Sequence, residues 1–164
     1  MKFYLKFLCF GLLLIFGTSL FAQNRVAILP FRNMDGNMQF NKYCYSLQEE
    51  LLKAFSEKDK DAKKISIVPP DSIEAALAGL NLDPNNPQYQ SDIWKVLEKL
   101  NINQAILANF NIQAERFLIN AFVYDVKTKL PNLEFQAKDI FKSEKNVSEC
   151  IPVIVKRLYP FFNK

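Results

Sequence analysis

The sequence contains no histidine and only four glycines among its 164 residues. Without histidine the chain cannot build a Ser-His-Asp or Cys-His catalytic centre or a histidine-ligated metal site. Gly11 and Gly17 lie in the apolar N-terminal segment, so only Gly36 and Gly79 remain elsewhere, too few for a glycine-rich phosphate-binding loop. These absences predict a protein that is not an enzyme, takes no cofactor and has no small-molecule substrate.

Cysteine is also scarce. Cys9 lies early in the N-terminal apolar run, three residues after Lys6, which is not the setting of a lipidated cysteine. Cys44 and Cys150 then remain, and two thiols cannot form a four-thiolate zinc site. Two interpretations stay open for this pair: one disulfide formed after export, or two buried thiols that behave as small apolar side chains.

The first 22 residues have the features of an export signal. Lys2 and Lys6 give a positive start, an uncharged apolar run follows over residues 7–21, and Ala22 places a small residue before the expected cleavage point. The alternative is an uncleaved anchor, although the run is short for a membrane span. We therefore predict a signal at 1–22 and one exported domain at 23–164, in the periplasm or cell envelope, with no membrane span after signal removal.

The charge balance excludes another class of partner. The formal net charge of +4 falls to about +2 once Lys2 and Lys6 are removed with the signal. The dense charge run at 56–64 mixes both signs, which is typical of a solvated loop. A chain this close to neutral is not expected to bind nucleic acid.

Strands and helices are predicted to alternate in the first half of the exported chain. Continuous apolar runs indicate buried strands at 25–31 and 65–68. Apolar residues at helical spacing predict one helix capped by Asn41. Two more short helices are expected, capped by Asp71 and by Ser91.

The hydrophobic period changes to two in the second half. Alternating apolar and polar residues predict three strands, at 108–115, at 117–126 and around 133–138, with a turn at 127–132. A last helix carries Val147, Ile151, Ile154 and Leu158 on one face. The expected fold is α/β with α+β character: a mixed sheet of about five strands, a parallel β-α-β start, an antiparallel meander, and helices packed on the sheet.

Several segments resemble a known family, in the same order along the chain. The run from Val26 to Phe31 (VAILPF), followed by Asn33, resembles the opening strand of the TolB amino-terminal domain, whose fold is shared by CsgG and by LpoB-type activators of penicillin-binding proteins. Trp94 and the segment 123–128 (VYDVKT) resemble later parts of that domain. The chain departs from the family at Asn109, where a glycine is usual, and we expect neither a β-propeller nor a long proline-rich stalk.

The resemblance implies a non-enzymatic protein-binding or adaptor module of the bacterial cell envelope, whose partners are envelope proteins. The alternative is a structural or secretion-linked envelope component with a CsgG-like role, which would assemble as an oligomer. Size-exclusion chromatography separates the two, because a ring-forming component elutes as a large discrete oligomer.

Each candidate residue has a structural and a functional interpretation. The five residues of the family-like motif are Pro30, Phe31, Asn33, Trp94 and Asp125. Strand ending, core packing and turn closure are the structural roles, whereas an exposed tryptophan is a common interface anchor. The polar row Asn109, Asn111 and Gln113 is either a partner surface or the solvated side of a sheet.

Overall fold

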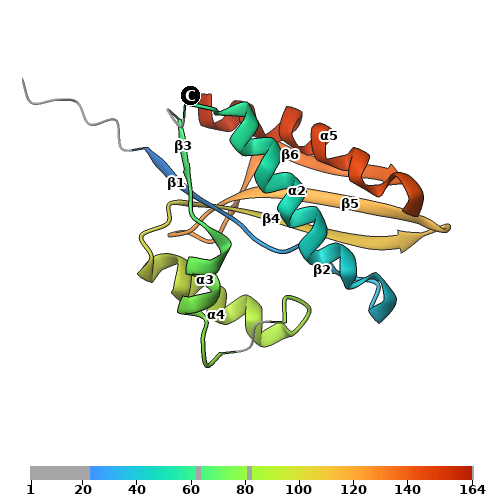
Figure 1. Ribbon diagram of the computed structural model, residues 1–164, viewed down its shortest axis with the longest axis horizontal. Helices are drawn as coiled ribbons and strands as arrows, with labels where there is room; N and C mark the ends of the chain where they lie inside the picture. The colour runs from blue at the N-terminus through green and yellow to red at the C-terminus, as the bar shows by residue number, and fades with distance from the viewer. Residues whose placement is uncertain (1–22, 62–63, 81–82, 164) are drawn as a thin grey trace, which may run out of the picture.

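The computed structural model describes residues 23–61, 64–80 and 83–163, and the predicted signal at 1–22 lies outside the described residues. Within this part the chain forms one mixed sheet with the strand order β3-β1-β4-β5-β6, and β2 pairs with β4 (Figure 1). The strands are β1 Asn24–Ile28, β2 Arg32–Asn33, β3 Ile65–Ile67, β4 Gln104–Gln113, β5 Arg116–Asp125 and β6 Pro131–Lys142. The expected α/β class with a mixed sheet is confirmed.

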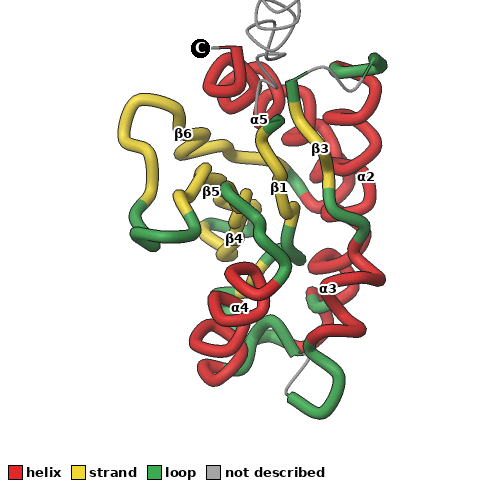
Figure 2. The backbone as a smooth tube through the Cα atoms, turned by 90° about the vertical axis from the view of Figure 1, so that its left-hand side faces the viewer, coloured by secondary structure: helices red, strands yellow, loops and turns green. Residues whose placement is uncertain are grey.

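The helices divide between the two faces of the sheet. They are α2 Lys42–Lys58, α3 Pro70–Ala76, α4 Pro87–Lys99 and α5 Cys150–Leu158, with short 3-10 turns at Met38–Phe40, Glu144–Glu149 and Tyr159–Asn163. Side chains of α2 and α5 pack into one apolar core with the sheet, and those of α3 and α4 pack into a second core on the opposite face. Figure 2 shows α5 and α4 on either side of the strands.

Period-two alternation places β4 between these cores. Ile106, Ala108 and Phe110 belong to the core under α2 and α5, while Ala105 and Leu107 contact the core under α3 and α4. Parallel pairing of β1 with both β3 and β4, and antiparallel pairing of β4 with β5 and of β5 with β6, confirm the predicted parallel start and meander.

The first strand is interrupted, and this adds a sixth strand to the five expected. Ile28 pairs with Ile106, and Arg32 pairs with Asn109. Between these two pairs the first strand advances by four residues, whereas β4 advances by three. The extra residue is a bulge next to Pro30, which has no backbone N–H to donate. Phe31 instead donates its N–H to the Cys44 carbonyl of α2 (2.9 Å).

Helix starts were the least accurate predictions. Asn41 is the N-cap residue of α2, as predicted, but its side chain makes no capping hydrogen bond, and a 3-10 turn capped by Asn37 precedes the helix. Asp71 lies in the first turn of α3 after the N-cap Pro69. The predicted cap Ser91 lies inside α4, whose true cap is Asn86, with a side-chain oxygen that accepts from the Gln88 N–H (2.9 Å). An early proline at the first helical position marks α3 and α4, where its missing donor costs little.

The last strand also differs from its predicted pattern. Simple alternation over 133–138 would place Leu133 and Ala137 on the same face, but Leu133 is 76% exposed, whereas Ala137 is buried, as is Ile140. Two register shifts between β5 and β6, together with the positive φ of Asp139 (57°), break the simple alternation. The four predicted inward residues of the last helix are all buried. Across the described residues, no helix combines the length and apolar character that crossing a membrane requires.

Candidate functional site

Near the carboxyl end of β1, two crossover connections run over opposite faces of the sheet. The β1-α2-β3 connection covers one face of the sheet, and the β3-α3-α4-β4 connection covers the other. Strand order reverses at β1, and in open α/β sheets ligands bind in the crevice outside the strand ends at such a point. The geometry therefore directs attention to the residues that follow Ile28.

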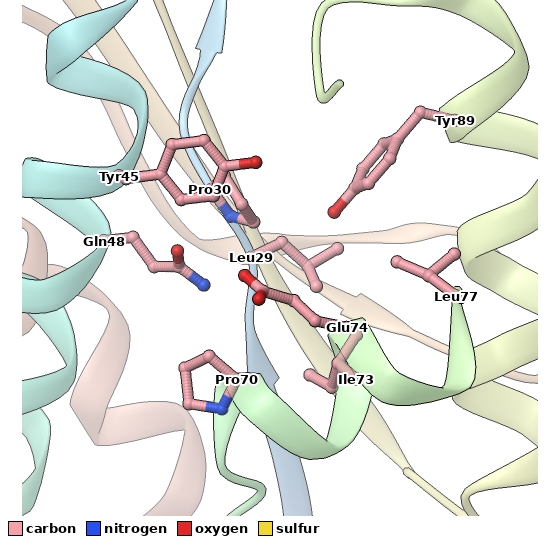
Figure 3. Close-up of a pocket in the computed structure, with 9 residues that line it drawn as sticks. All are labelled: Leu29, Pro30, Tyr45, Gln48, Pro70, Ile73, Glu74, Leu77 and Tyr89. Carbon is pink, nitrogen blue, oxygen red and sulfur yellow. The ribbon is translucent and has the colours of Figure 1, made fainter. Parts of the chain in front are cut away.

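A cavity of about 240 Å³ occupies this position. We call it the β1 pocket; it is lined by Leu29, Pro30, Tyr45, Gln48, Pro70, Ile73, Glu74, Leu77 and Tyr89. The residues come from the end of β1 and from α2, α3 and α4. Figure 3 shows the hydroxyls of Tyr45 and Tyr89 pointing toward one another and the Glu74 carboxylate pointing toward Gln48.

Gln48 of α2 is held by a hydrogen bond to the last residue of β1. Its side chain is buried, and its amide nitrogen donates to the Ile28 carbonyl (2.8 Å). A buried carbonyl without a partner is costly, so this bond stabilises the end of the strand. The same bond holds the glutamine against the β1 pocket.

Burial and negative charge perturb the two tyrosines. Burial is the main cause that raises the pKa of Tyr89 well above its usual value of 10, and nearby Tyr45 and Glu74 raise it further. The pKa of Tyr45 is also raised, first by burial and then by Glu74 and Asp83. Both phenols are therefore neutral at ordinary pH, and they can donate or accept hydrogen bonds but supply no charge.

A second hollow adjoins the first along Leu29, Pro30 and Tyr89. We call this hollow, of about 360 Å³, the sheet groove; it is lined by Leu29, Pro30, Arg32, Met34, Pro84, Tyr89, Gln90, Ile93, Trp94, Leu107, Ala108, Asn109, Phe122, Tyr124 and Lys129. Aromatic rings line it: Trp94 contacts Tyr124 (centroids 5.7 Å apart), and Tyr124 contacts Phe122 (6.3 Å).

The sheet groove brings together three of the residues singled out in the sequence. Pro30, Trp94 and Asn109 all line it, although they come from three different elements. Asn109 also accepts a long hydrogen bond from Asn120 of β5 (3.4 Å). Asn111 and Gln113 are exposed further along β4, beyond this groove, so the structure does not join the whole polar row into one site.

The other motif residues have structural surroundings. Phe31 is fully buried in the larger core. The side chain of Asn33 donates to the Asn37 carbonyl (2.9 Å) and to Asn41 Oδ1 (2.8 Å), and it accepts from the Asp35 N–H (3.0 Å).

Asp125 closes the turn between β5 and β6. Its carboxylate accepts from the Thr128 N–H (2.7 Å) and from the Thr128 hydroxyl (2.9 Å). The hydrogen bond from the Thr128 N–H is the main cause that holds the pKa of Asp125 below its usual value.

Cys44 and Cys150 are both free and buried in the structure, in the same core between α2, α5 and the sheet. Burial raises the pKa of the Cys150 thiol to about 12 and also raises that of Cys44. The Asn85 side chain donates a 3.9 Å hydrogen bond to the Cys44 sulfur. The structure thus agrees with the second interpretation, two buried thiols. A disulfide between Cys44 and Cys150 stays a hypothesis, which thiol counting can test.

Sequence reasoning missed Tyr45, Glu74 and Tyr89. Tyr89 precedes Ser91, the predicted start of its helix, so it was placed in a loop. The Asn86-Pro87 pair was the available signal, because a capping residue followed by proline marks a helix start.

Comparison with known proteins identifies similar folds. No protein-family model and no curated sequence matches the chain. The LpoB C-terminal domain from Salmonella enterica superposes with a TM-score of 0.56 at 12% identity, over 75% of this chain and 84% of that one. Lipoprotein GNA1162 from Neisseria meningitidis gives 0.53 at 9% identity, over 81% and 94%. TolB from Acinetobacter baumannii gives 0.37 at 18% identity, over 81% and 28%. The predicted fold resemblance to LpoB is confirmed, and the CsgG-like role stays a prediction.

Proposed function

We propose that the protein is an exported, non-enzymatic module that binds another protein of the bacterial cell envelope. The observation that carries the proposal is the aromatic lining of the sheet groove, formed by Trp94, Phe122 and Tyr124. Tryptophan and tyrosine are the residues that most often dominate binding energy at protein interfaces. Met34 lies at the same groove with 52% of its surface exposed, and an exposed methionine adapts readily to a partner.

The fold also supports a role in binding an envelope protein. Its similarity to the LpoB C-terminal domain and to lipoprotein GNA1162 makes an envelope setting the natural proposal, although fold alone does not fix function. The chemistry of the crevice also supports binding. Its side chains offer two neutral phenols and one carboxylate, and the chain has no histidine to pair with a nucleophile.

Site-specific photo-crosslinking in the source bacterium tests the proposal. A benzophenone amino acid replaces Met34 at the sheet groove, and in a control it replaces Lys53, an exposed residue of α2 outside this groove. We expect a discrete adduct with an envelope protein from position 34 only. The purified partner should then bind the wild-type protein, and Trp94→Ala should weaken that binding about tenfold or more.

Equal adducts from positions 34 and 53, or undiminished binding by the Trp94→Ala variant, would contradict the proposal. A circular dichroism spectrum of each variant checks that the fold is intact. Trp94 is only partly buried, so its truncation leaves the two main cores in place.

A further inference from the structure

The β1 pocket has an unbalanced negative charge. Glu74 is the only charged residue among its nine lining residues, and none of them is lysine or arginine. Among the described residues, the Glu74 carboxylate makes no ion pair or hydrogen bond. Glu74 is an exposed residue, and Figure 3 shows its carboxylate turned toward Gln48 among the side chains that line the pocket. A carboxylate in this position favours a positively charged ligand.

The other polar groups of the pocket suit the same kind of ligand. The Gln48 amide nitrogen donates one of its two N–H groups to the Ile28 carbonyl, and its side-chain oxygen accepts no hydrogen bond from the described residues. The Tyr89 hydroxyl makes no hydrogen bond within the described residues and faces the cavity. Carboxylate, amide and phenol oxygens all accept hydrogen bonds, and tyrosine rings attract a cation over their faces.

The size of the pocket limits the ligand. Its volume of about 240 Å³ lies below the roughly 300–1,000 Å³ of sites for drug-sized molecules. It equals about eight water volumes of roughly 30 Å³ each. This space fits a single amine or guanidine with its short alkyl stem, and it is small for a nucleotide or an oligosaccharide.

We propose that the β1 pocket binds one ammonium or guanidinium group, with Glu74 as the ion-pairing partner and Tyr89 and Gln48 as hydrogen-bond acceptors. The group belongs either to a lysine or arginine side chain of the protein partner or to a free small amine. The first source rests on the proposed function and extends it, because the β1 pocket adjoins the sheet groove at Leu29, Pro30 and Tyr89.

Titration of the purified, nitrogen-15-labelled protein with n-butylammonium chloride, followed by NMR, tests the proposal. We expect saturable shifts of the backbone amides of Gln48, Leu77 and Tyr89 at millimolar concentrations. Glu74→Gln should raise the Kd about fivefold or more, because it removes a charge-assisted hydrogen bond. Glu115→Gln is the matched control: it removes the same charge at the β4–β5 hairpin, outside the β1 pocket, and should bind as the wild type does. Sodium acetate, an anion, should cause no saturable shift at these positions.

Two further ligands separate the sources. A pentapeptide with one central lysine between glycines should bind about tenfold more tightly than n-butylammonium if the pocket takes a partner's side chain. Putrescine binding at least as tightly as the peptide would assign a free amine. Absence of saturable shifts with every cation, or equal affinity in the Glu74→Gln variant, would overturn the proposal. The crosslink from position 34 does not depend on Glu74, so failure here is distinguishable from failure of the proposed function.

Discussion

At the scale of single residues, asparagine side chains make several of the hydrogen bonds that hold the loop after β2. Asn33 is buried, and its side chain bonds to three partners within the 33–41 segment. Asn85 adds a fourth link, because its Oδ1 accepts from the Asn33 N–H (2.8 Å). These short polar side chains hold the loop after β2 against the start of α2. The resemblance singled out Asn33, and the structure gives this residue a positioning role in the loop.

Asn33→Ala should destabilise the protein by about 1–3 kcal/mol, because Asn41 Oδ1 and the Asn37 carbonyl lose their donor in a half-buried site. Urea unfolding of purified protein measures the change. Asn111→Ala, on the exposed end of β4, is the control and should stay within about 0.5 kcal/mol of wild type. Equal effects of the two substitutions would show that the hydrogen bonds of the Asn33 side chain contribute nothing specific to stability.

The two cysteines should behave as unreactive buried thiols. Because burial raises the pKa of Cys150 to about 12 and raises that of Cys44, the thiolate fraction at pH 8 is very small. We expect slow reaction of the native protein with a thiol reagent, and two thiols per chain after denaturation without reductant. A count of zero in the denatured protein would establish the bridge instead.

At the scale of elements, helix starts depend on the exact capping residue. α4 begins at Pro87 because Asn86 caps it, whereas Ser91 donates its hydroxyl to the Gln88 carbonyl inside the helix. The difference of five residues between the two caps decides whether Tyr89 belongs to a loop or to a helix that faces the β1 pocket.

Asn86→Ala should therefore lower the free energy of unfolding by about 1 kcal/mol, the usual cost of a lost cap. Ser91→Ala, at the position favoured by sequence alone, should change it by less than about 0.5 kcal/mol. Denaturant unfolding compares the two variants directly. A larger loss from Ser91→Ala than from Asn86→Ala would show that the helix starts later.

The β5–β6 turn should lose stability in acid. The folded pKa of Asp125 is below its ordinary value of 3.8, mainly because the Thr128 N–H bonds to the carboxylate. Its stabilising contribution is therefore present above pH 3.8 and is lost as the pH falls through the folded pKa. Asp125→Asn should cost about 0.5 kcal/mol at pH 7, a low figure because solvent screens this partly exposed group. The difference from wild type should vanish near pH 2, as unfolding curves at both pH values will show.

At the scale of the whole molecule, the two crossovers create the candidate site. α2 and α3 belong to opposite sides of the sheet, yet both reach past the end of β1. The chain bulges next to Pro30, which cannot donate a backbone hydrogen bond, and Pro30 lines both the β1 pocket and the sheet groove. The two hollows therefore meet at this interruption of the strand.

The predicted export also concerns the whole chain. N-terminal sequencing of protein from the envelope fraction should begin at Gln23, because residues 1–22 combine a positive start, an apolar run and a small residue before the cut. A sequence that begins at Met1 would instead indicate a retained anchor, and the proposed binding surface would then be tethered to the membrane.

The sequence by itself determined the order of the elements and the inward faces of most of them. Period-two alternation in β4 and β5 and the helical spacing in α5 are local signals, since the side-chain direction in a strand or helix follows from its own backbone period. The pattern failed at β2 and in β6, where a bulge and two register shifts arise from pairing with another strand. No local signal reports such pairing.

Only the tertiary structure decided the candidate site. Tyr45, Glu74 and Tyr89 lie on three helices, far apart in the chain and without any recognisable spacing. They meet because the β1-α2-β3 crossover runs over one face of the sheet and the β3-α3-α4-β4 crossover passes back across β1 on the other face. Helices from both faces therefore border the carboxyl end of β1. A side chain's neighbours at a switch point depend on the handedness and reach of both crossovers, which are properties of the folded chain and of no single segment.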